Sequence, residues 1–184
     1  RYPLKAAGGE ALQVAQLTPE GVDGDRRFMV ATFGGRYLTQ REHPSLATVR
    51  ATLSDDGGLQ LAAPGQPSLD VPLQHGPATI SATLFAERIR CIDQGQVAGG
   101  WFTKFLGASD SLLPMLGIPS HRLLRAQRVS GRRAGFSDVA PLLVICDASL
   151  AALNARRKPG LPQVTLDRFR PNMLVSGCAP FEED

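Results

Sequence analysis

Glycine, proline and acidic turns divide the first half of the chain into short apolar segments at regular spacing. Residues 28–33 and 36–40 flank a Gly-Gly pair, the strongest hairpin signal in the chain. Residues 46–53 and 59–63 flank an Asp-Asp-Gly-Gly turn and predict a second hairpin. Regularly spaced short strands with polar turns are typical of a barrel or a sandwich. Further alternating apolar segments continue this series at residues 69–73, 80–85 and 89–92.

Helical patterns are few. Residues 96–106 place apolar side chains at helical spacing, and Gly107 suits the C-terminal stop of that helix. Residues 114–119, rich in proline and glycine, mark the seam between two units. The sequence therefore predicts a mostly β chain of the α+β class, with domains at residues 1–115 and 116–184.

The second unit opens with a strand followed by a helix. The apolar run at residues 141–146 indicates a buried strand. The helix that follows is expected to be capped by Asp147 or Ser149 and to bury Leu150 and Leu153.

Composition limits the possible partners of the chain. Its 184 residues are 43% hydrophobic and 20% charged, as in a globular protein. The net charge of +3 and the scattered arginines do not support nucleic-acid binding. No apolar stretch is long enough to span a bilayer, so the chain is not expected to enter a membrane.

The three cysteines, Cys91, Cys146 and Cys178, are widely spaced and form no Cys-x-x-Cys pair. An odd and scattered set is typical of reduced thiols in a cytosolic compartment, so we expect no disulfide framework and a cytoplasmic location. The three histidines are equally scattered, and no metal-binding spacing is present.

The most informative polar motif is Arg-Phe-Arg-Pro-Asn, near the end of the chain. Extended backbone would place Arg168 and Arg170 on one face and Phe169, as a buried anchor, on the other. Pro171 favours an extended Arg170 at the start of a strand. Two guanidinium groups at the lip of a sheet suit a phosphate or a carboxylate. The alternative is a solvated or ion-paired surface pair.

Two further segments carry candidate groups. Asp25 and Arg26 open the first hairpin, where the carboxylate could orient the guanidinium toward a ligand or simply pair with it. Lys5 is a third cation near the N-terminus. Ser137 and Asp138 precede the predicted strand at residue 141, where an ordinary polar turn is the alternative. No catalytic triad or carboxylate pair supports a hydrolase.

Together these segments resemble the molybdenum cofactor sulfurase C-terminal (MOSC) family. The match is closest to members with an N-terminal β-barrel, the mitochondrial amidoxime-reducing component and its bacterial relatives. It runs in order along the chain and is loose between about residues 57 and 90. The segments that carry it are YPLKAAGG, DRRFMV, YLTQREHPSLATV, FSDVAPLLVICDASLAALNAR and RFRPNMLVSGCAPFEED.

The resemblance implies a fold, a cofactor and a site. The fold would be an N-terminal MOSC-type β-barrel followed by the first part of a MOSC β-barrel. The parent protein would bind the molybdenum pyranopterin cofactor and reduce N-hydroxylated compounds, such as amidoximes and hydroxylated base analogues. Electrons would come from a ferredoxin-like or flavoprotein electron donor, either a separate protein or a further domain. The residues expected at the cofactor, by their match to family motifs, are Lys5, Arg26, Ser137, Asp138, Arg170 and Asn172; Arg168 would only support them.

The chain departs from the family pattern at two places. Ala6 replaces the serine that usually follows the lysine, so one hydroxyl contact is expected to be lost. The metal-binding cysteine is expected beyond Asp184, and Cys178 matches a Gly-Cys segment that is not the metal ligand. The chain is therefore expected to be truncated and inactive by itself, with an exposed sheet edge that could self-associate.

Two alternatives to the reductase remain open. One is a module that carries or inserts the cofactor or sulfur without turnover. The other is an anion-binding β module with no catalysis.

Overall fold

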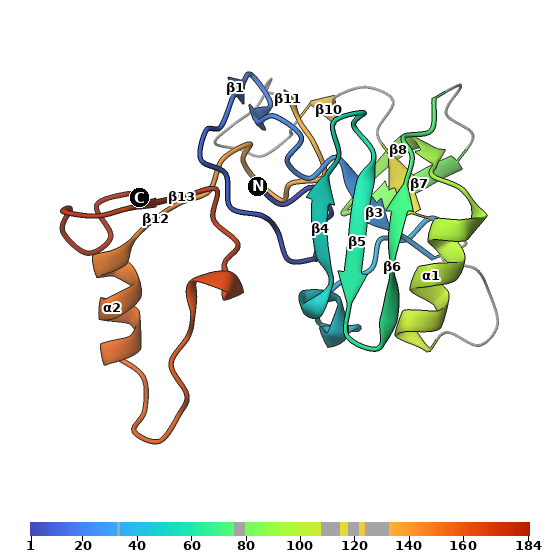
Figure 1. The fold of residues 1–184 in the computed structure, drawn as a ribbon. Helices are drawn as coiled ribbons and strands as arrows, with labels where there is room; N and C mark the ends of the chain where they lie inside the picture. Colours follow the sequence, from blue (N-terminus) through green and yellow to red (C-terminus); the bar gives the residue numbers. More distant parts are fainter. Residues whose placement is uncertain (33, 76–79, 108–114, 118–121, 124–132) are drawn as a thin grey trace. The chain divides into compact units, whose positions relative to one another are not determined.

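The computed structural model describes residues 1–32, 34–75, 80–107, 115–117, 122–123 and 133–184 (Figure 1). Packing divides the chain into two units, Arg1–Pro141 and Leu142–Asp184, named unit 1 and unit 2 below. The predicted α+β class is confirmed, because short strands dominate and only two α-helices occur among the described residues.

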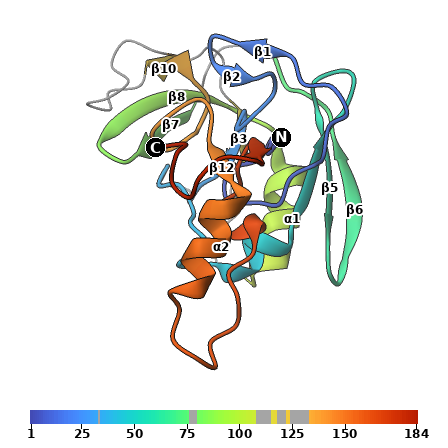
Figure 2. The same ribbon diagram turned by 90° about the vertical axis from the view of Figure 1, so that its left-hand side faces the viewer.

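The first sheet of unit 1 has three antiparallel strands in the order β4-β5-β6. They span Arg50–Leu53, Leu59–Ala63 and Gln66–Val71. Along β5, Leu59 and Leu61 are buried and Gln60 is exposed, the period of two that the sequence predicted. Helix α1 (Gln96–Leu106) lies beside β6 in Figure 1, and Figure 2 shows it next to the first sheet from the side. It ends at Gly107, whose φ of 64° is left-handed, as expected.

The second sheet of unit 1 has the order β3-β9-β8-β7. Its strands are β3 (Phe28–Val30), β7 (Ile80–Leu84), β8 (Glu87–Asp93) and β9 (Met115–Gly117). Single residue pairs, Ala31 with Tyr37 and Arg36 with Thr83, connect the end of β3 to β7. The series of pairings thus returns to the strand from which it started, as in a small barrel.

Smaller elements complete unit 1. Leu4 pairs with Phe28 and Gly8 with Arg50, so the N-terminal segment joins the two sheets. The remaining elements are β1 (Leu17–Thr18), β2 (Gly21–Val22), the 3-10 helix η1 (Pro44–Thr48), β10 (Arg122–Leu123) and β11 (Arg133–Ala134).

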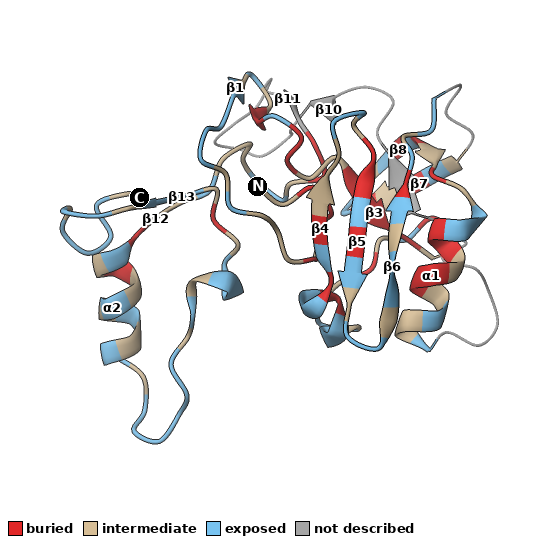
Figure 3. Cartoon of the chain, in the orientation of Figure 1, coloured by how far each residue is buried: buried red, intermediate tan, exposed pale blue. Residues whose placement is uncertain are grey.

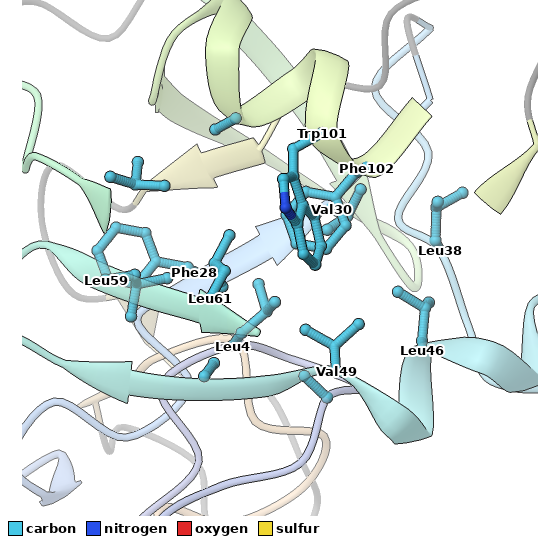
Figure 4. Close-up of a cluster of buried hydrophobic side chains, with 14 residues drawn as sticks. Leu4, Phe28, Val30, Leu38, Leu46, Val49, Leu59, Leu61, Trp101 and Phe102 are labelled. Carbon is cyan, nitrogen blue, oxygen red and sulfur yellow. The ribbon is translucent and has the colours of Figure 1, made fainter. Parts of the chain in front are cut away.

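Two groups of buried side chains form the core of unit 1. The larger one lies between the first sheet, the N-terminal segment and α1, and Figure 4 shows Trp101 and Phe102 of α1 entering it. The indole Nε1 of Trp101 donates to the Pro67 carbonyl at 2.8 Å, which fixes α1 against β6. The smaller group lies between β3, β7 and β8 and includes Cys91 and Phe136.

Unit 2 is built around a parallel pair of short strands. These are β12 (Val144–Cys146) and β13 (Met173–Val175), with Cys146 opposite Val175. Helix α2 (Asp147–Ala155) and the 3-10 helix η2 (Leu166–Arg168) lie between them in sequence. Most residues of this unit are exposed or half-buried (Figure 3).

Several local predictions for unit 2 are wrong. The N-terminal cap of α2 is Cys146, and not Asp147 or Ser149 as expected. Asp147 is instead the first residue of the helix, where its Oδ1 accepts the Ala148 N–H at 2.7 Å. Leu153 is 36% exposed and Ser149 is the buried residue of α2. The reason is that residues 178–184 pack at the start of this helix, where Ser149 donates to Glu183 Oε2 at 2.7 Å. An isolated helical pattern cannot reveal this contact.

The expectation of three reduced thiols is also wrong. Cys146 and Cys178 form a disulfide, with their Cα atoms 6.7 Å apart, and only Cys91 is a free thiol. Parallel pairing places the end of β12 beside the end of β13, and Cys178 lies three residues beyond the partner of Cys146. Sequence spacing cannot predict this proximity, because it depends on strand register.

Neither α1 nor α2, the two α-helices of the described part of the chain, has the length and apolar content needed to cross a membrane.

Candidate functional site

The N-terminal segment runs alongside residues 25–28 in unit 1. The Arg26 N–H donates to the Tyr2 carbonyl at 2.7 Å, and the Phe28 N–H donates to the Pro3 carbonyl at 3.0 Å. The Lys5 N–H then donates to the Phe28 carbonyl at 2.8 Å. These bonds fix Lys5 and Arg26 on neighbouring backbones, although the two residues belong to different motifs of the sequence.

Asp25 pairs with the guanidinium of Arg26, a contact that is common to the two roles considered for it. Arg26 Nη1 lies 2.5 Å from Asp25 Oδ2, and its guanidinium carbon lies 4.7 Å from the centroid of the Tyr2 ring. Asp25 is buried, and its other oxygen accepts the Tyr2 N–H at 2.8 Å. Arg26 has a φ of 47°, a left-handed conformation that is uncommon outside glycine. The guanidinium is thus held by a carboxylate and an aromatic ring.

The main chain of Phe136 connects Arg26 to Lys5. Its N–H donates to the Arg26 carbonyl at 2.7 Å, and its carbonyl accepts from Lys5 Nζ at 2.9 Å. Gly135 allows its backbone to lie this close to that of Arg26, because a Cβ at residue 135 would lie 2.5 Å from the Arg26 carbonyl oxygen.

Ser137 and Asp138 follow directly. Asp138 forms an ion pair with Lys5 Nζ, and its side chain is 61% exposed. The Oγ of Ser137 is buried. Unit 1 therefore brings together Lys5, Arg26, Ser137 and Asp138, the four residues predicted for this part of the chain.

Two aromatic residues at this cluster were missed by the sequence reasoning. Lys5 Nζ lies 5.5 Å from the centroid of the Tyr37 ring and 5.7 Å from that of Phe85. The available signal was Phe85 itself, an aromatic residue in the two-residue turn between β7 and β8, where glycine or asparagine is usual. A bulky residue that breaks a turn rule indicates a functional constraint.

In unit 2, Asn172 binds the main chain at the start of β12. Its N–H donates to the Leu143 carbonyl at 2.8 Å, and its Oδ1 accepts the Leu143 N–H at 3.1 Å. The Nδ2 atom is buried and has no hydrogen-bond acceptor among the residues that the structure describes. Buried donors are normally hydrogen-bonded, so this amide could donate to an acceptor that a ligand supplies.

The predicted geometry of the Arg-Phe-Arg-Pro-Asn motif is wrong. Arg168 belongs to η2, Phe169 is 36% exposed, and Arg170 has a φ of 54°. The chain turns here because the Phe169 and Arg170 N–H groups both donate to the Leu166 carbonyl. Arg168 and Arg170 therefore do not share one face of a strand. Local turn hydrogen bonds overrode the extended preference before Pro171.

None of the cysteines is an accessible thiolate. Burial raises the pKa of Cys91 to about 11, and Cys146 and Cys178 are bonded to each other. The expectation that Cys178 is not a metal ligand stays a prediction. Across the described ranges, no group of three or more histidine, cysteine or acidic side chains could hold a metal ion.

Comparison with known families assigns both parts of the chain. Residues 1–109 match the family described as the MOSC N-terminal beta barrel domain, and residues 131–184 match the MOSC domain. The family matches end at residue 109 and begin again at residue 131, whereas the packing divides after Pro141. The predicted seam near residue 115 stays a prediction.

Curated relatives match over the whole chain. It is 31% identical over 195 residues to mitochondrial amidoxime reducing component 2 of Bos taurus, and 30% identical over 194 residues to that of Homo sapiens. Each match covers 100% of this chain and 56% of the relative, so the chain spans about half the length of these proteins.

Among solved structures, a solution structure of a Bordetella bronchiseptica protein matches with a TM-score of 0.43 and 21% identity. That match covers 59% of this chain and 90% of the other, and it supports no inference about function.

The resemblance found in the motifs is therefore confirmed, and the chain belongs to the MOSC family, in the group whose MOSC domain follows a MOSC N-terminal β-barrel domain.

Proposed function

We propose that this chain supplies the phosphate-binding part of a molybdenum-cofactor site in a reductase of N-hydroxylated compounds. The observation that carries the proposal is the main chain of Phe136, which binds both the Arg26 carbonyl and the Lys5 ammonium and so holds these two residues in one part of unit 1. Relatives named amidoxime reducing components, at about 30% identity, support the reaction class. Amidoximes and hydroxylated base analogues are the proposed substrates.

The residues present fit the anionic end of such a cofactor. Lys5 offers a compact ammonium and Arg26 a planar fork of donors, and both groups bind phosphate oxygens. In unit 2, Asn172 is proposed because it matches a family position, and its buried Nδ2 is a donor without an acceptor among the described residues. We include Arg170 and Ser137 in the proposed set because they occupy the family positions.

When bound, the cofactor supplies the oxygen-transfer and redox chemistry, and the protein supplies orientation and electrostatics. Asp25 keeps the Arg26 guanidinium fixed, so little freedom is lost when an anion binds. Asp138 neutralises Lys5 in the structure, and we propose that a ligand phosphate takes its place at the ammonium.

The metal thiolate is proposed to come from outside residues 1–184. The state of Cys91, Cys146 and Cys178 supports this, because none of them can coordinate a metal as it stands. The electron donor is proposed to be a ferredoxin-like or flavoprotein unit, either a separate protein or a further domain. The predicted cytoplasmic location also remains a proposal, since the relatives are named as mitochondrial proteins.

The first test measures molybdenum and pterin content of the full-length protein. Lys5→Ala and Arg26→Ala should each lower cofactor affinity by about tenfold or more, because each removes a charge-assisted contact. Lys104→Ala is the matched control, since Lys104 is an exposed lysine on α1. Unchanged cofactor content in Lys5→Ala and Arg26→Ala would contradict the site.

A second test separates the reductase from a carrier module. Cofactor-loaded full-length protein is mixed with benzamidoxime and a chemical electron donor, and benzamidine is measured. Turnover supports the reductase, whereas stoichiometric cofactor transfer to an acceptor protein without turnover would favour the carrier. A protein that purifies without molybdenum would leave only the anion-binding module.

A further inference from the structure

The ammonium of Lys5 faces two aromatic rings from different parts of unit 1. Its Nζ lies 5.5 Å from the centroid of Tyr37 and 5.7 Å from that of Phe85. The two rings are themselves neighbours, with centroids 5.6 Å apart and planes inclined by 59°. The Phe136 carbonyl accepts from the same Nζ at 2.9 Å. A flexible lysine side chain is thus held from several directions.

Backbone pairing fixes the two rings relative to each other. Tyr37 pairs with Ala31, and its neighbour Arg36 pairs with Thr83, close to Phe85. The Thr83 N–H also donates to the Gly35 carbonyl at 2.8 Å. Gly35 has a φ of 82°, and a Cβ there would lie 2.3 Å from the Ser81 carbonyl oxygen. Glycine therefore permits the close approach that brings the two aromatic residues together.

Phe85 has an unfavourable backbone conformation and an exposed apolar side chain. Its φ is 54°, and its side chain is 54% exposed in the turn between β7 and β8. Left-handed conformations are unfavourable for bulky residues. An exposed phenylalanine also contributes little hydrophobic stabilisation, because much of its ring stays in water. The contacts with Tyr37 and Lys5 account for a phenylalanine at this position.

The rings and the carboxylate act on Lys5 in different ways. Asp138 neutralises the ammonium and competes with any anion for the same charge. An aromatic face attracts the ammonium through its quadrupole but carries no net charge. The two rings can therefore hold Nζ in place while leaving its charge available to a phosphate.

We propose that Tyr37 and Phe85 are positioning residues that hold the Lys5 ammonium for binding of a phosphate group. This inference rests on the proposed function, in which Lys5 binds the phosphate of the cofactor. It adds two residues that act through Lys5 and do not themselves contact the anion. The role requires an aromatic ring at both positions, because an aliphatic side chain has no quadrupole to attract the ammonium.

The test is a titration of the chain with inorganic phosphate, followed by NMR of the Lys5 side chain. In the unsubstituted chain, the ε-methylene protons of Lys5 should be shifted upfield by the ring currents of the two aromatic residues. Phe85→Leu and Tyr37→Leu should each reduce this shift and weaken phosphate binding roughly two- to fivefold. The double variant should weaken it roughly tenfold.

The controls separate positioning from structure. Phe85→Tyr and Tyr37→Phe keep the rings and should keep both the shift and the affinity. Phe181→Leu is the matched substitution, because Phe181 is also an exposed phenylalanine with a positive φ, 67°, and faces Arg156 in unit 2. It should leave phosphate binding unchanged.

The outcomes distinguish this inference from the proposed function. If Lys5→Ala abolishes phosphate binding while the two leucine variants bind normally, the positioning role is overturned and the function stands. The same holds if the aromatic variants weaken binding as much as the leucine variants. If Lys5→Ala binds phosphate normally, or the unsubstituted chain binds none, both are overturned.

Discussion

Gly35 shows how a single residue without a side chain determines the site. Its left-handed φ and its contact with the Ser81 carbonyl permit the pairing that places Tyr37 beside Phe85. The sequence places this glycine in the turn of a predicted hairpin. The structure has the bridge between Ala31 and Tyr37 at this position, and the Thr32 and Leu38 N–H groups donate to the Arg36 and Val30 carbonyls across it. The sequence could not show the contact with residue 81, because that contact depends on the position of β7.

We predict that Gly35→Ala destabilises the chain more than Gly65→Ala does. Both residues have positive φ, 82° and 72°, but a Cβ at Gly65 meets nothing within 4 Å. Backbone strain alone should cost about 1–2 kcal/mol at Gly65. The added clash at Gly35 should raise the total to about 3 kcal/mol or more. Urea unfolding of both variants measures the difference, and equal destabilisation would contradict the close approach.

Cys91 is predicted to be chemically inert in the folded chain. Burial raises its pKa to about 11, so at pH 8 about one thiol in a thousand is ionised. A disulfide reagent should therefore modify no thiol in native buffer and one thiol per chain in concentrated urea. Rapid reaction of one thiol in native buffer would contradict the buried position of Cys91 or the disulfide between the other two cysteines.

At the scale of elements, the apolar patterns of the first half predicted β4 to β8 and α1, although residues 46–48, expected at the start of the β4 strand, belong to η1. Their apolar residues alternate, or recur at helical spacing, because each element buries one face. Helix α2 was less predictable. It is short, and its N-terminus depends on the C-terminal segment, which lies about thirty residues away in sequence.

Glu183 is predicted to stabilise this arrangement only when ionised. It accepts the Cys146 N–H at 2.9 Å and the Ser149 hydroxyl, and these two bonds lower its pKa below the ordinary value of 4.5. A lowered pKa means that the contribution is fully present above pH 4.5 and is lost as the pH falls through the lower, folded-state pKa.

NMR of the Cys146 amide proton as a function of pH measures this transition. The midpoint should lie below pH 4.5 and should be absent in Glu183→Gln. A midpoint at or above that value would show that the tail does not bind the start of α2.

At the scale of the whole molecule, the two units have different sources of stability. Unit 1 contains both groups of buried hydrophobic side chains, whereas unit 2 buries little and has a disulfide. Small units with limited cores commonly depend on such cross-links. The fold class was predictable from local patterns in the sequence. The disulfide was not, because it depends on a contact between distant segments. The Arg170 turn was not predictable either, because hydrogen bonds to the Leu166 carbonyl overrode the extended preference of a residue before proline.

Reduction is predicted to destabilise unit 2 selectively. The disulfide closes a loop with a sequence separation of 32, for which loop entropy gives about 3–4 kcal/mol. Hydrogen exchange of α2 amides should become faster after reduction. The fluorescence transition of Trp101, the only tryptophan and a residue of unit 1, should stay unchanged.

The variant with both Cys146→Ser and Cys178→Ser serves as the control, since its α2 exchange should not respond to reductant. If reduction also lowered the stability measured by the Trp101 fluorescence transition, and by the same amount, the disulfide would stabilise the whole chain and not unit 2 alone.

The bridge through Phe136 has a consequence for mutational studies of this protein. Lys5 and Arg26 are connected by an N–H and a carbonyl that every residue except proline possesses. An alanine scan would therefore record only the loss of the buried ring of residue 136 and would leave the bridge intact. Its contribution becomes visible when the peptide bond itself is changed, for example by replacing the amide with an ester through semisynthesis.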